Sequence, residues 1–511
     1  MRNLPSLLLT GFYYLFGLIF LWLFLSITFN NQTYQFKTLY IVLYVIGWLF
    51  VTGYVYKAIK HAEHFLQIHE RKIVSLWMLV LFSAQLFCGY WLAVATGWDT
   101  EAVFRGAIIL KEQGNLGGYS EYFHIFPHNL GAASALQLVF TICSIPGFQD
   151  YHWIATVYNV ISINLGIFFV YLICRELKSI KAAFLSLWLS SCCIPLYFYT
   201  PIFYSDTLSL PFVMMTYYLY LQILKSENTK QQLTRAAVLA VACAIGTLIK
   251  FTVIIVAIAV LMDLVLRGNL KKYWLAVIVA GGIFYALLSG FNYYRYNHLL
   301  DKNLSEQKQV PYTHWVMMGL SGNGAYNGSD YEYTYTFSTR EARTQANIER
   351  IGQRLKEYGV GGYLEFLHRK QQLSFGSGIY GVNEMIDDNP LRPNSLHQVA
   401  IEGGKYYETF KHMAHGYHIF LFLLIILSAV YDAAAKTRGS INKLVVRLSI
   451  TGIFIFLALW EANSRYILNF IPMFIACAAL GFPELYRVAG IIKNSLQQHI
   501  RETRNSDIQL T

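Results

Sequence analysis

The sequence is poor in charge. Only 14% of its 511 residues are charged, whereas 55% are hydrophobic and 16% are aromatic. A soluble domain usually has about 25% charged residues, so the composition excludes an ordinary soluble protein and indicates an integral membrane protein. Residues 7–29 carry no charge and lack a small-residue cleavage site. This run predicts a retained first membrane span and not a removable signal peptide.

Motifs for nucleotides and metals are also missing. The chain has no P-loop and no Rossmann glycine pattern in a strand–turn–helix context, which argues against a nucleotide-driven step or a nucleotide-sugar donor. Its seven cysteines lie in or at the ends of apolar runs and show no CxxC spacing. They are expected to be core residues. We therefore expect no cofactor, and a metal site is not favoured.

The charges that are present predict an orientation. Six basic segments hold 21 of the 40 Lys and Arg residues, and placing them in the cytoplasm satisfies the positive-inside rule. The segment 292–415 is neutral, with 13 Lys or Arg against 13 Asp or Glu. The net charge of +11 is thus assigned to topology and not to nucleic-acid binding. The basic segments are residues 57–72, 174–181, 224–235, 267–272, 432–447 and the tail from Arg487.

These loops predict an all-α, multi-pass protein with about twelve membrane helices (roughly 11–14) and both termini in the cytoplasm. An apolar segment at 128–147 does not fit as a full span, so we expect a juxtamembrane or re-entrant helix on the outer side. The predicted divisions are a membrane region 1–291 with an outer loop 96–128, an extracellular loop domain 292–415, membrane helices 416–486 and a cytoplasmic tail 487–511. The predicted spans are 7–29, 39–56, 73–95, 152–173, 182–198, 206–224, 234–249, 252–267, 273–291, 416–431, 443–460 and 466–485.

The large loop 292–415 is predicted to be helical or mixed. A capping-box spacing at Ser338 and Glu341 predicts a helix that ends at Gly359. A second helix is expected over residues 362–376. The glycine-rich stretch 321–330 is expected to form turns that cover a cleft.

Charged residues at the outer membrane edge are the first functional candidates, because such groups are costly at membrane depth. Asp99 and Glu101 follow an early span, and Lys250 interrupts an uncharged stretch. Arg465 and Tyr466 precede the last span. Each has a structural alternative: acidic residues in a helix first turn for Asp99 and Glu101, a snorkelling side chain for Lys250, and an interfacial anchor for Arg465 and Tyr466.

Weaker candidates line the same predicted face. Asp206 opens a span, where it would either cap the helix or contact substrate. Glu461 lies four residues before Arg465 and is expected to orient it. Pro127 separates His124 from His128, which argues against a regular helix and against a shared metal site there. The residues assigned to the edge of a substrate cleft are Glu101, His124, His128, Asn129, Asp206 and Glu461.

GWDTEAVFRGA (97–107), EYFHIFPHNLG (121–131), the lysine at 250 and SRY (464–466) together resemble a known family. The chain resembles the GT-C superfamily of integral membrane glycosyltransferases, of the protein-mannosyltransferase and aminoarabinose-transferase type, especially Gram-positive members. Relatives often have YPNN or HPP where this chain has FPHN. His314, Trp315 and Lys370 also resemble positions in Gram-positive relatives, and the sequence assigns them no role.

The resemblance implies transfer of a sugar from a polyprenyl-phosphate donor to an acceptor hydroxyl on the outer face of the cell membrane. This chemistry needs a carboxylate to accept a proton and cations to stabilise the departing phosphate. We expect Asp99 to be the base and Lys250, Arg465 and Tyr466 to bind the donor phosphate. The expected acceptor is a cell-wall polysaccharide, teichoic acid or glycolipid, and separate proteins are expected to make and flip the donor.

Two other functions stay open. A lipid-linked-sugar flippase or transporter would use its ionisable residues along a path across the membrane, and it would tend to show internal repeats. No repeat is found in this sequence. A polysaccharide polymerase or ligase would perform related chemistry on a different fold. The clustering of candidates on one predicted face favours the enzyme.

Overall fold

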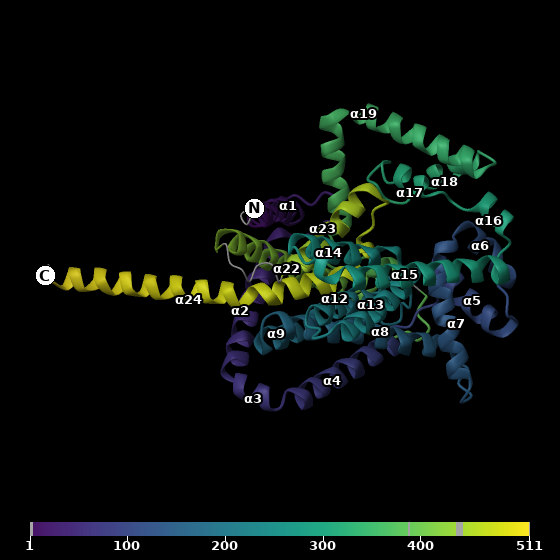
Figure 1. The fold of residues 1–511 in the computed structure, drawn as a ribbon. Helices are drawn as coiled ribbons and strands as arrows, with labels where there is room; N and C mark the ends of the chain where they lie inside the picture. The colour runs from purple at the N-terminus through teal and green to yellow at the C-terminus, as the bar shows by residue number, and fades with distance from the viewer. Residues whose placement is uncertain (1–3, 387–388, 436–442, 510–511) are drawn as a thin grey trace.

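The computed structural model describes residues 4–386, 389–435 and 443–509. In this part of the chain the protein is helical, and β pairing is limited to one isolated bridge between Val94 and Pro390. Figure 1 shows a bundle of long helices with shorter helices gathered at one end. The expectation of an all-α fold is confirmed.

The described residues contain nine helical segments long and apolar enough to cross a membrane. Three further predicted spans correspond to shorter apolar helices: α9 (Ile180–Cys192), α14 (Ile254–Leu266) with the short η3 (Phe251–Val253) before it, and α23 (Leu444–Leu459). The protein is thus a multi-pass membrane protein. The spanning helices are α1 (Leu4–Phe29), α2 (Thr38–His61), α4 (Glu70–Trp91), α8 (Tyr151–Leu177), α12 (Leu210–Leu224) with the short α11 (Ser205–Leu208), α13 (Thr229–Ile249), α15 (Leu270–Tyr294), α22 (Tyr407–Ala435), and α24 (Ile471–Gln509) with η6 (Ser464–Phe470) before it.

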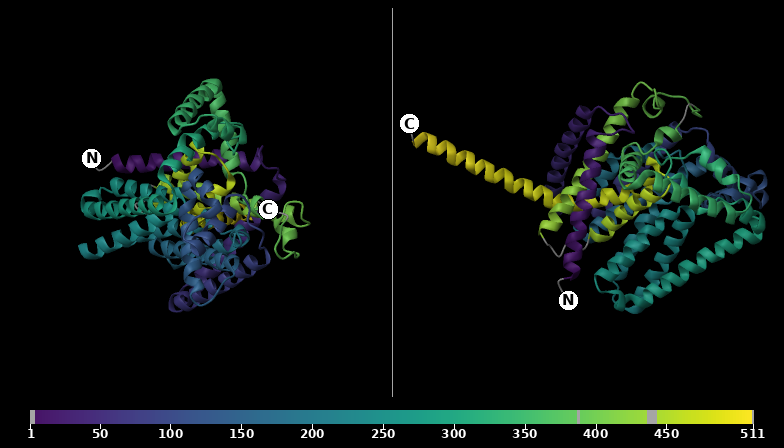
Figure 2. Two further views of the ribbon diagram at one scale, coloured as in Figure 1. Left: turned by 90° about the vertical axis from the view of Figure 1, so that its right-hand side faces the viewer. Right: turned by 90° about the horizontal axis from the view of Figure 1, so that it is seen from above.

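The core is formed by helices that are distant in sequence. α22 packs along α1 and α24, and α12 packs between α8 and α13. Backbone groups are satisfied within each helix, as a lipid environment requires. The last part of α24 extends away from the bundle (Figures 1 and 2).

Two loops predicted to be cytoplasmic meet at one end of the bundle. Arg175 Nε lies 2.8 Å from Glu70 Oε1, and Lys181 Nζ lies 2.7 Å from Glu63 Oε1. These pairs join the end of α8 to the first residue of α4, and the start of α9 to α3 (Glu63–Ile68). The two basic segments therefore share one end, as the predicted topology requires.

Three shorter helices, α5 (Trp98–Gln113), α6 (Ser120–Ile125) and α7 (Leu130–Ser144), gather at the right of Figure 1. The segments Gly117–Ile125 and Pro127–Ser144 are bent by 115° relative to each other. Pro127 opens the second segment and cannot donate the hydrogen bond that would continue the first. The expected break in the helix between His124 and His128 is therefore confirmed.

The segment between α15 and α22 is also helical where it is described. Its longest element, α19 (Arg340–Phe375), bends at Gly359, whose φ of +57° and ψ of −176° suit glycine alone. The prediction of two helices meeting at Gly359 is confirmed, but the capping residue is Thr339 and not Ser338, because the Thr339 hydroxyl accepts from the Ala342 amide. The other elements are α16 (Lys302–Lys308), α17 (Tyr312–Met318), α18 (Gly328–Tyr335), α20 (Val382–Met385) and α21 (His397–Ala400).

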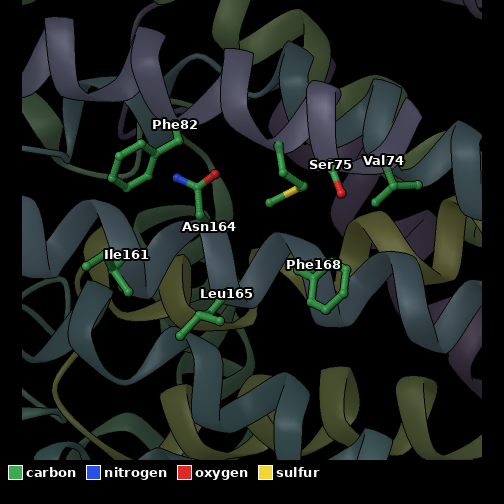
Figure 3. Close-up of a pocket in the computed structure, with 8 residues that line it drawn as sticks. Val74, Ser75, Phe82, Ile161, Asn164, Leu165 and Phe168 are labelled. Atoms are coloured by element: carbon green, nitrogen blue, oxygen red, sulfur yellow. The ribbon is translucent and has the colours of Figure 1, made fainter. Parts of the chain in front are cut away.

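An apolar cavity of about 310 Å³ lies between α4 and α8 (Figure 3). Phe82 and Val74 come from α4, and Leu165 and Phe168 come from α8. Asn164 is the most polar of its labelled residues. None of the residues that line this cavity belongs to the candidate site described below.

Candidate functional site

Asp99 lies in the first turn of α5 and is held by tyrosine. Its Oδ1 accepts a hydrogen bond from the Tyr122 hydroxyl at 2.8 Å, and its Oδ2 lies 3.4 Å from the Tyr204 hydroxyl. The helix is capped at Gly97, in an extended conformation and without a side-chain bond. Asp99 therefore does not cap the helix, but Asp99 and Glu101 both lie in its first turn, as the structural alternative for them expected. Its carboxylate is partly exposed and faces the residues at the broken helix.

Asn129 joins the two tyrosines. Its Nδ2 donates to the Tyr122 hydroxyl at 2.5 Å, and its Oδ1 lies 3.1 Å from the Tyr204 hydroxyl. Tyr204 has one hydroxyl proton, so it donates to Asn129 or to Asp99. The bend at Pro127 turns Asn129 back toward Tyr122, which explains why α6 must end where it does.

A second cluster contains two cations around one buried carboxylate. Asp206 in α11 is 1% exposed, forms an ion pair with the Lys250 ammonium, and has its Oδ2 3.4 Å from Arg465 Nε. Lys250 occupies the extended break between α13 and η3. The cluster has two positive charges and one negative charge, so it retains a net charge of about +1.

The structural alternatives given above for Lys250, Arg465 and Asp206 are wrong. Lys250 does not snorkel to the interface and Arg465 does not anchor outward, because both pair with Asp206 inside the protein. Asp206 does not cap a helix, since Tyr204 precedes α11 and Ser209 precedes α12. Arg465 Nε and Asp206 Oδ2 lack hydrogen-bond partners among the described residues. Donor capacity is therefore left at this cluster.

The two clusters meet at aromatic rings. The Arg465 guanidinium lies 5.4 Å from the centre of the Tyr204 ring and 5.6 Å from that of Tyr466. The Lys250 ammonium lies 5.3 Å from the Tyr466 ring. Tyr204 thus contacts Arg465 with its ring and Asp99 with its hydroxyl, so the carboxylate of Asp99 and the guanidinium of Arg465 are neighbours.

Glu461 completes this region from the loop after α23. It is 5% exposed, and its Oε1 accepts from the Tyr466 hydroxyl at 3.1 Å. Burial raises the pKa of the Glu461 carboxyl to about 7, and the negative charge of Asp99 adds to the effect. The expectation that Glu461 orients Arg465 across a helical turn is wrong, because the chain at 461–463 is not helical and the hydrogen bond goes to Tyr466.

Lys370 in α19 is buried next to Glu461. Its ammonium donates to the carbonyl oxygens of Gly319 at 2.6 Å and Ala458 at 3.1 Å. Burial lowers the pKa of Lys370 to about 7, against the opposing charge of Glu461. A Cβ at Gly319 would lie 2.7 Å from the backbone of Trp460, so glycine allows α17 to approach this loop. The large loop is thereby fixed against the site.

Two of the weaker candidates, Glu101 and His124, lie outside the two clusters. Glu101 bonds to Arg105 at 2.9 Å and to the Thr96 hydroxyl. His124 is buried and its Nδ1 lies 2.7 Å from the Ser305 hydroxyl, which joins α6 to α16. These contacts hold the elements together, and neither side chain joins the Asp99 or Asp206 cluster.

Sequence reasoning missed the segment 376–386. Gly381 lies against the Arg465 side chain, and Met385 Sδ is 3.1 Å from Arg465 Nη1. Glu384 accepts from Asn463 Nδ2 at 3.0 Å. The one signal available was the glycine-rich stretch GSGIYG, which does not indicate a partner 80 residues later.

The candidate histidines do not form a metal site. His124 contacts Ser305, whereas His128 is exposed and faces the Trp315 ring with 6.1 Å between ring centres. Within residues 4–386, 389–435 and 443–509, no group of three or more His, Cys, Asp or Glu is arranged to hold a metal ion.

The fold of the chain is similar to those of three solved structures. Oligosaccharyltransferase AglB from Archaeoglobus fulgidus, in complex with an inhibitory peptide and a dolichol-phosphate, is 14% identical, with 82% of this chain and 52% of that chain covered and a TM-score of 0.45. The apo form of the Archaeoglobus fulgidus oligosaccharyltransferase is 14% identical, with 83% and 52% covered and a TM-score of 0.47. ArnT from Cupriavidus metallidurans, bound to undecaprenyl phosphate, is 11% identical, with 81% and 78% covered and a TM-score of 0.35.

This chain spans about half the length of the two oligosaccharyltransferase chains. No curated protein matches the sequence. A family model described as "Conserved hypothetical integral membrane protein" matches residues 3–486, which is most of the chain. The protein with this buried cluster of carboxylates and cations thus belongs to the family of conserved hypothetical integral membrane proteins.

Proposed function

We propose that this protein is a GT-C-type glycosyltransferase that moves a sugar from a polyprenyl-phosphate donor to an acceptor hydroxyl. The observation that carries the proposal is the bridge made by Tyr204. Its hydroxyl lies 3.4 Å from Asp99 Oδ2 and its ring lies 5.4 Å from the Arg465 guanidinium. A candidate base and a candidate leaving-group site are therefore side by side.

Asp99 is the proposed general base. Its carboxylate accepts the proton of the acceptor hydroxyl while the hydroxyl oxygen bonds to the anomeric carbon of the sugar. Tyr122 holds Oδ1 at 2.8 Å, which keeps the carboxylate oriented during the proton transfer. Inversion at the anomeric carbon is what the family resemblance implies.

The cluster of Lys250 and Arg465 is the proposed phosphate site. As the bond between the anomeric carbon and the phosphate oxygen breaks, the phosphate keeps the electron pair and its negative charge grows. Fixed cations stabilise such a charge most effectively in a site with little water. Asp206 neutralises only one of the two cations, and the guanidinium provides a planar donor fork that suits phosphate.

The proposal includes a location and partners. The protein lies in the cell membrane of a Gram-positive type of cell, with both termini in the cytoplasm and the site at the extracellular face. The donor is made by a separate synthase and moved across the membrane by a flippase. The acceptor belongs to a cell-wall polysaccharide, teichoic acid or glycolipid.

A transferase is favoured over a flippase or transporter by the position of these side chains. Asp99, Lys250 and Arg465 come from three distant segments, and they converge at one place instead of following a path through the bundle. A polymerase or ligase would share the chemistry, but the resemblance in sequence is to single-sugar transferases.

The test uses purified full-length protein in proteoliposomes. It is supplied with a panel of radiolabelled polyprenyl-phosphate sugars and with a mixture of cell-wall glycans and glycolipids. The proposal expects one donor to lose its sugar to an acceptor and to leave free polyprenyl phosphate. Movement of an intact donor between leaflets without sugar transfer would instead identify a flippase.

A further inference from the structure

A partly exposed set of aromatic rings lies beside the candidate site and has no part in the chemistry above. We call it the aromatic shelf. It comes from three segments distant in sequence: the turn at the broken helix, the large loop, and the end of α23. The members of the aromatic shelf are Phe126, His128, Tyr312, Trp315, Tyr331 and Trp460.

The rings of the aromatic shelf contact one another. Trp315 stacks on Trp460 with 6.2 Å between ring centres and an interplanar angle of 23°. His128 meets Trp315 edge-on at 6.1 Å. Phe126 stacks on Tyr331 at 6.4 Å, and Tyr312 lies 6.3 Å from Trp460. Distances in this range are those of favourable aromatic pairs, so the shelf is a formed surface and not scattered rings.

The aromatic shelf is open to a ligand. His128 is exposed, Tyr312 is 63% exposed, and Trp315 and Trp460 are partly exposed. Rings that served only to attach the large loop would gain more stabilisation if they were fully buried. Exposed rings in contact leave apolar faces available.

Two covalent neighbours tie the aromatic shelf to the site. Trp460 precedes Glu461, and His128 precedes Asn129, which bonds to the Tyr122 hydroxyl that holds Asp99. Trp460 and His128 are thus each one residue away along the chain from a side chain of the candidate site. A sugar ring has C–H groups on its face and hydroxyls on its rim. Apolar ring faces can pack against the C–H groups, and the neighbouring carboxylate and amide groups can form hydrogen bonds with the hydroxyls.

We infer that the aromatic shelf binds a pyranose ring next to Asp99, as the subsite that holds the saccharide of the acceptor. This inference rests on the proposed function for the identity of the neighbouring base. It assigns the acceptor to carbohydrate and not to a protein side chain or a lipid hydroxyl. It also gives the large loop, through Trp315, a direct part in substrate binding.

The test compares ring removal with ring replacement in full-length protein in lipid nanodiscs. Trp315→Leu removes the aromatic face, Trp315→Phe keeps one, and Trp274→Leu is the matched control on the exposed surface of α15, where the indole is 56% exposed. Half-saturating concentrations of acceptor and of donor are measured in the transfer assay. Tryptophan fluorescence is titrated separately with chitotriose and maltotriose, without donor.

The inference expects Trp315→Leu to raise the half-saturating acceptor concentration about 3- to 10-fold, the range of one aromatic contact. In Trp315→Phe the half-saturating acceptor concentration should return most of the way to the wild-type value, and in Trp274→Leu it should not change. The effect of Trp315→Leu should fall on this concentration and not on the maximal transfer rate. If Trp315→Leu instead raises the half-saturating concentration of the donor, the pyranose on the shelf is the donor sugar, and the acceptor assignment is overturned. No change in either concentration, with transfer intact, overturns the shelf as a subsite.

Failure of the proposed function gives a different result. If wild type transfers no sugar but an oligosaccharide changes its fluorescence, and Trp315→Leu abolishes that change, the shelf stands as a saccharide site and the transferase proposal falls. If neither transfer nor a fluorescence change occurs, the shelf falls as well. His128→Ala, at an exposed ring, replaces Trp315→Leu if the latter does not fold, and the expected direction is the same.

Discussion

Glu461 illustrates how a single buried carboxyl can control the pH response of the site. Its pKa is raised from 4.5 to about 7 by burial, so the folded protein binds a proton between these values that the unfolded chain has released. The stability linked to this group is fully present below pH 4.5 and is lost as the pH rises through about 7. The largest loss for such a shift is about 3 kcal/mol.

Glu461→Gln should remove this dependence. Glutamine retains an oxygen to accept from the Tyr466 hydroxyl but cannot ionise, so the variant should be more stable than wild type at pH 8 and similar at pH 5. The measurement is the thermal unfolding midpoint in detergent from pH 5 to 8. Parallel curves for the two proteins would show that Glu461 does not titrate in this range.

The roles of individual residues were harder to predict from the sequence than the side of the membrane on which they lie. The sequence indicated that Asp99, Lys250 and Arg465 share one face, because each stands at the predicted outer edge of an apolar run. It did not indicate that Asp206 pairs with both cations, since contacts between segments that are distant in sequence leave no periodic signal. The contacts of Tyr122 and Tyr204 with Asp99 have no signal in the sequence either, because an interface aromatic and a hydroxyl donor look alike there.

At the scale of elements, apolar runs predicted helices well. Each predicted span overlaps a helix, and the expected breaks at Pro127 and Gly359 occur. Boundaries were less predictable, because neighbouring contacts decide them. α19 begins after Thr339 and not Ser338, and α22 begins at Tyr407, well before the apolar run at 416.

The bend in α19 depends on Gly359, and this gives a prediction. Gly359→Ala places a side chain at φ +57°, which should cost about 1–3 kcal/mol in the stability of the large loop. Gly352→Ala is the matched control in the same helix, where the added Cβ meets no atom within 4 Å and alanine favours the helix. Hydrogen exchange over residues 340–375 should be faster in the first variant and no faster in the second. Equal protection in both would contradict the role of the bend.

The whole molecule brings together segments that lie far apart in sequence. Residues near 99, 206, 250 and 465 form one site, and the aromatic shelf adds rings from near 128, 315 and 460. Membrane topology allowed the first grouping to be predicted, because it assigns each loop to a side. The aromatic shelf depends on how the large loop folds over the bundle, which apolar patterning does not encode.

The predicted orientation is testable in intact cells. In a variant without native cysteines, Gly118→Cys should react with a membrane-impermeant maleimide added outside, because it is exposed in the 3-10 helix Gly117–Tyr119 of the predicted outer loop. Lys60→Cys, at the end of α2, should react only after the membrane is opened. The reverse labelling pattern would place the site in the cytoplasm and would remove the outer-face part of the proposal.

The most direct test of the proposed chemistry is single-turnover sugar transfer by Asp99→Asn. The variant keeps the shape of the side chain but cannot accept a proton, and loss of a general base typically costs about 10²- to 10⁴-fold in rate. Glu112→Gln is the matched control, an exposed carboxyl in the same helix. The account predicts that Asp99→Asn binds donor normally and transfers at least about 100-fold more slowly, whereas Glu112→Gln matches wild type. Transfer at the wild-type rate by well-folded Asp99→Asn protein would contradict it.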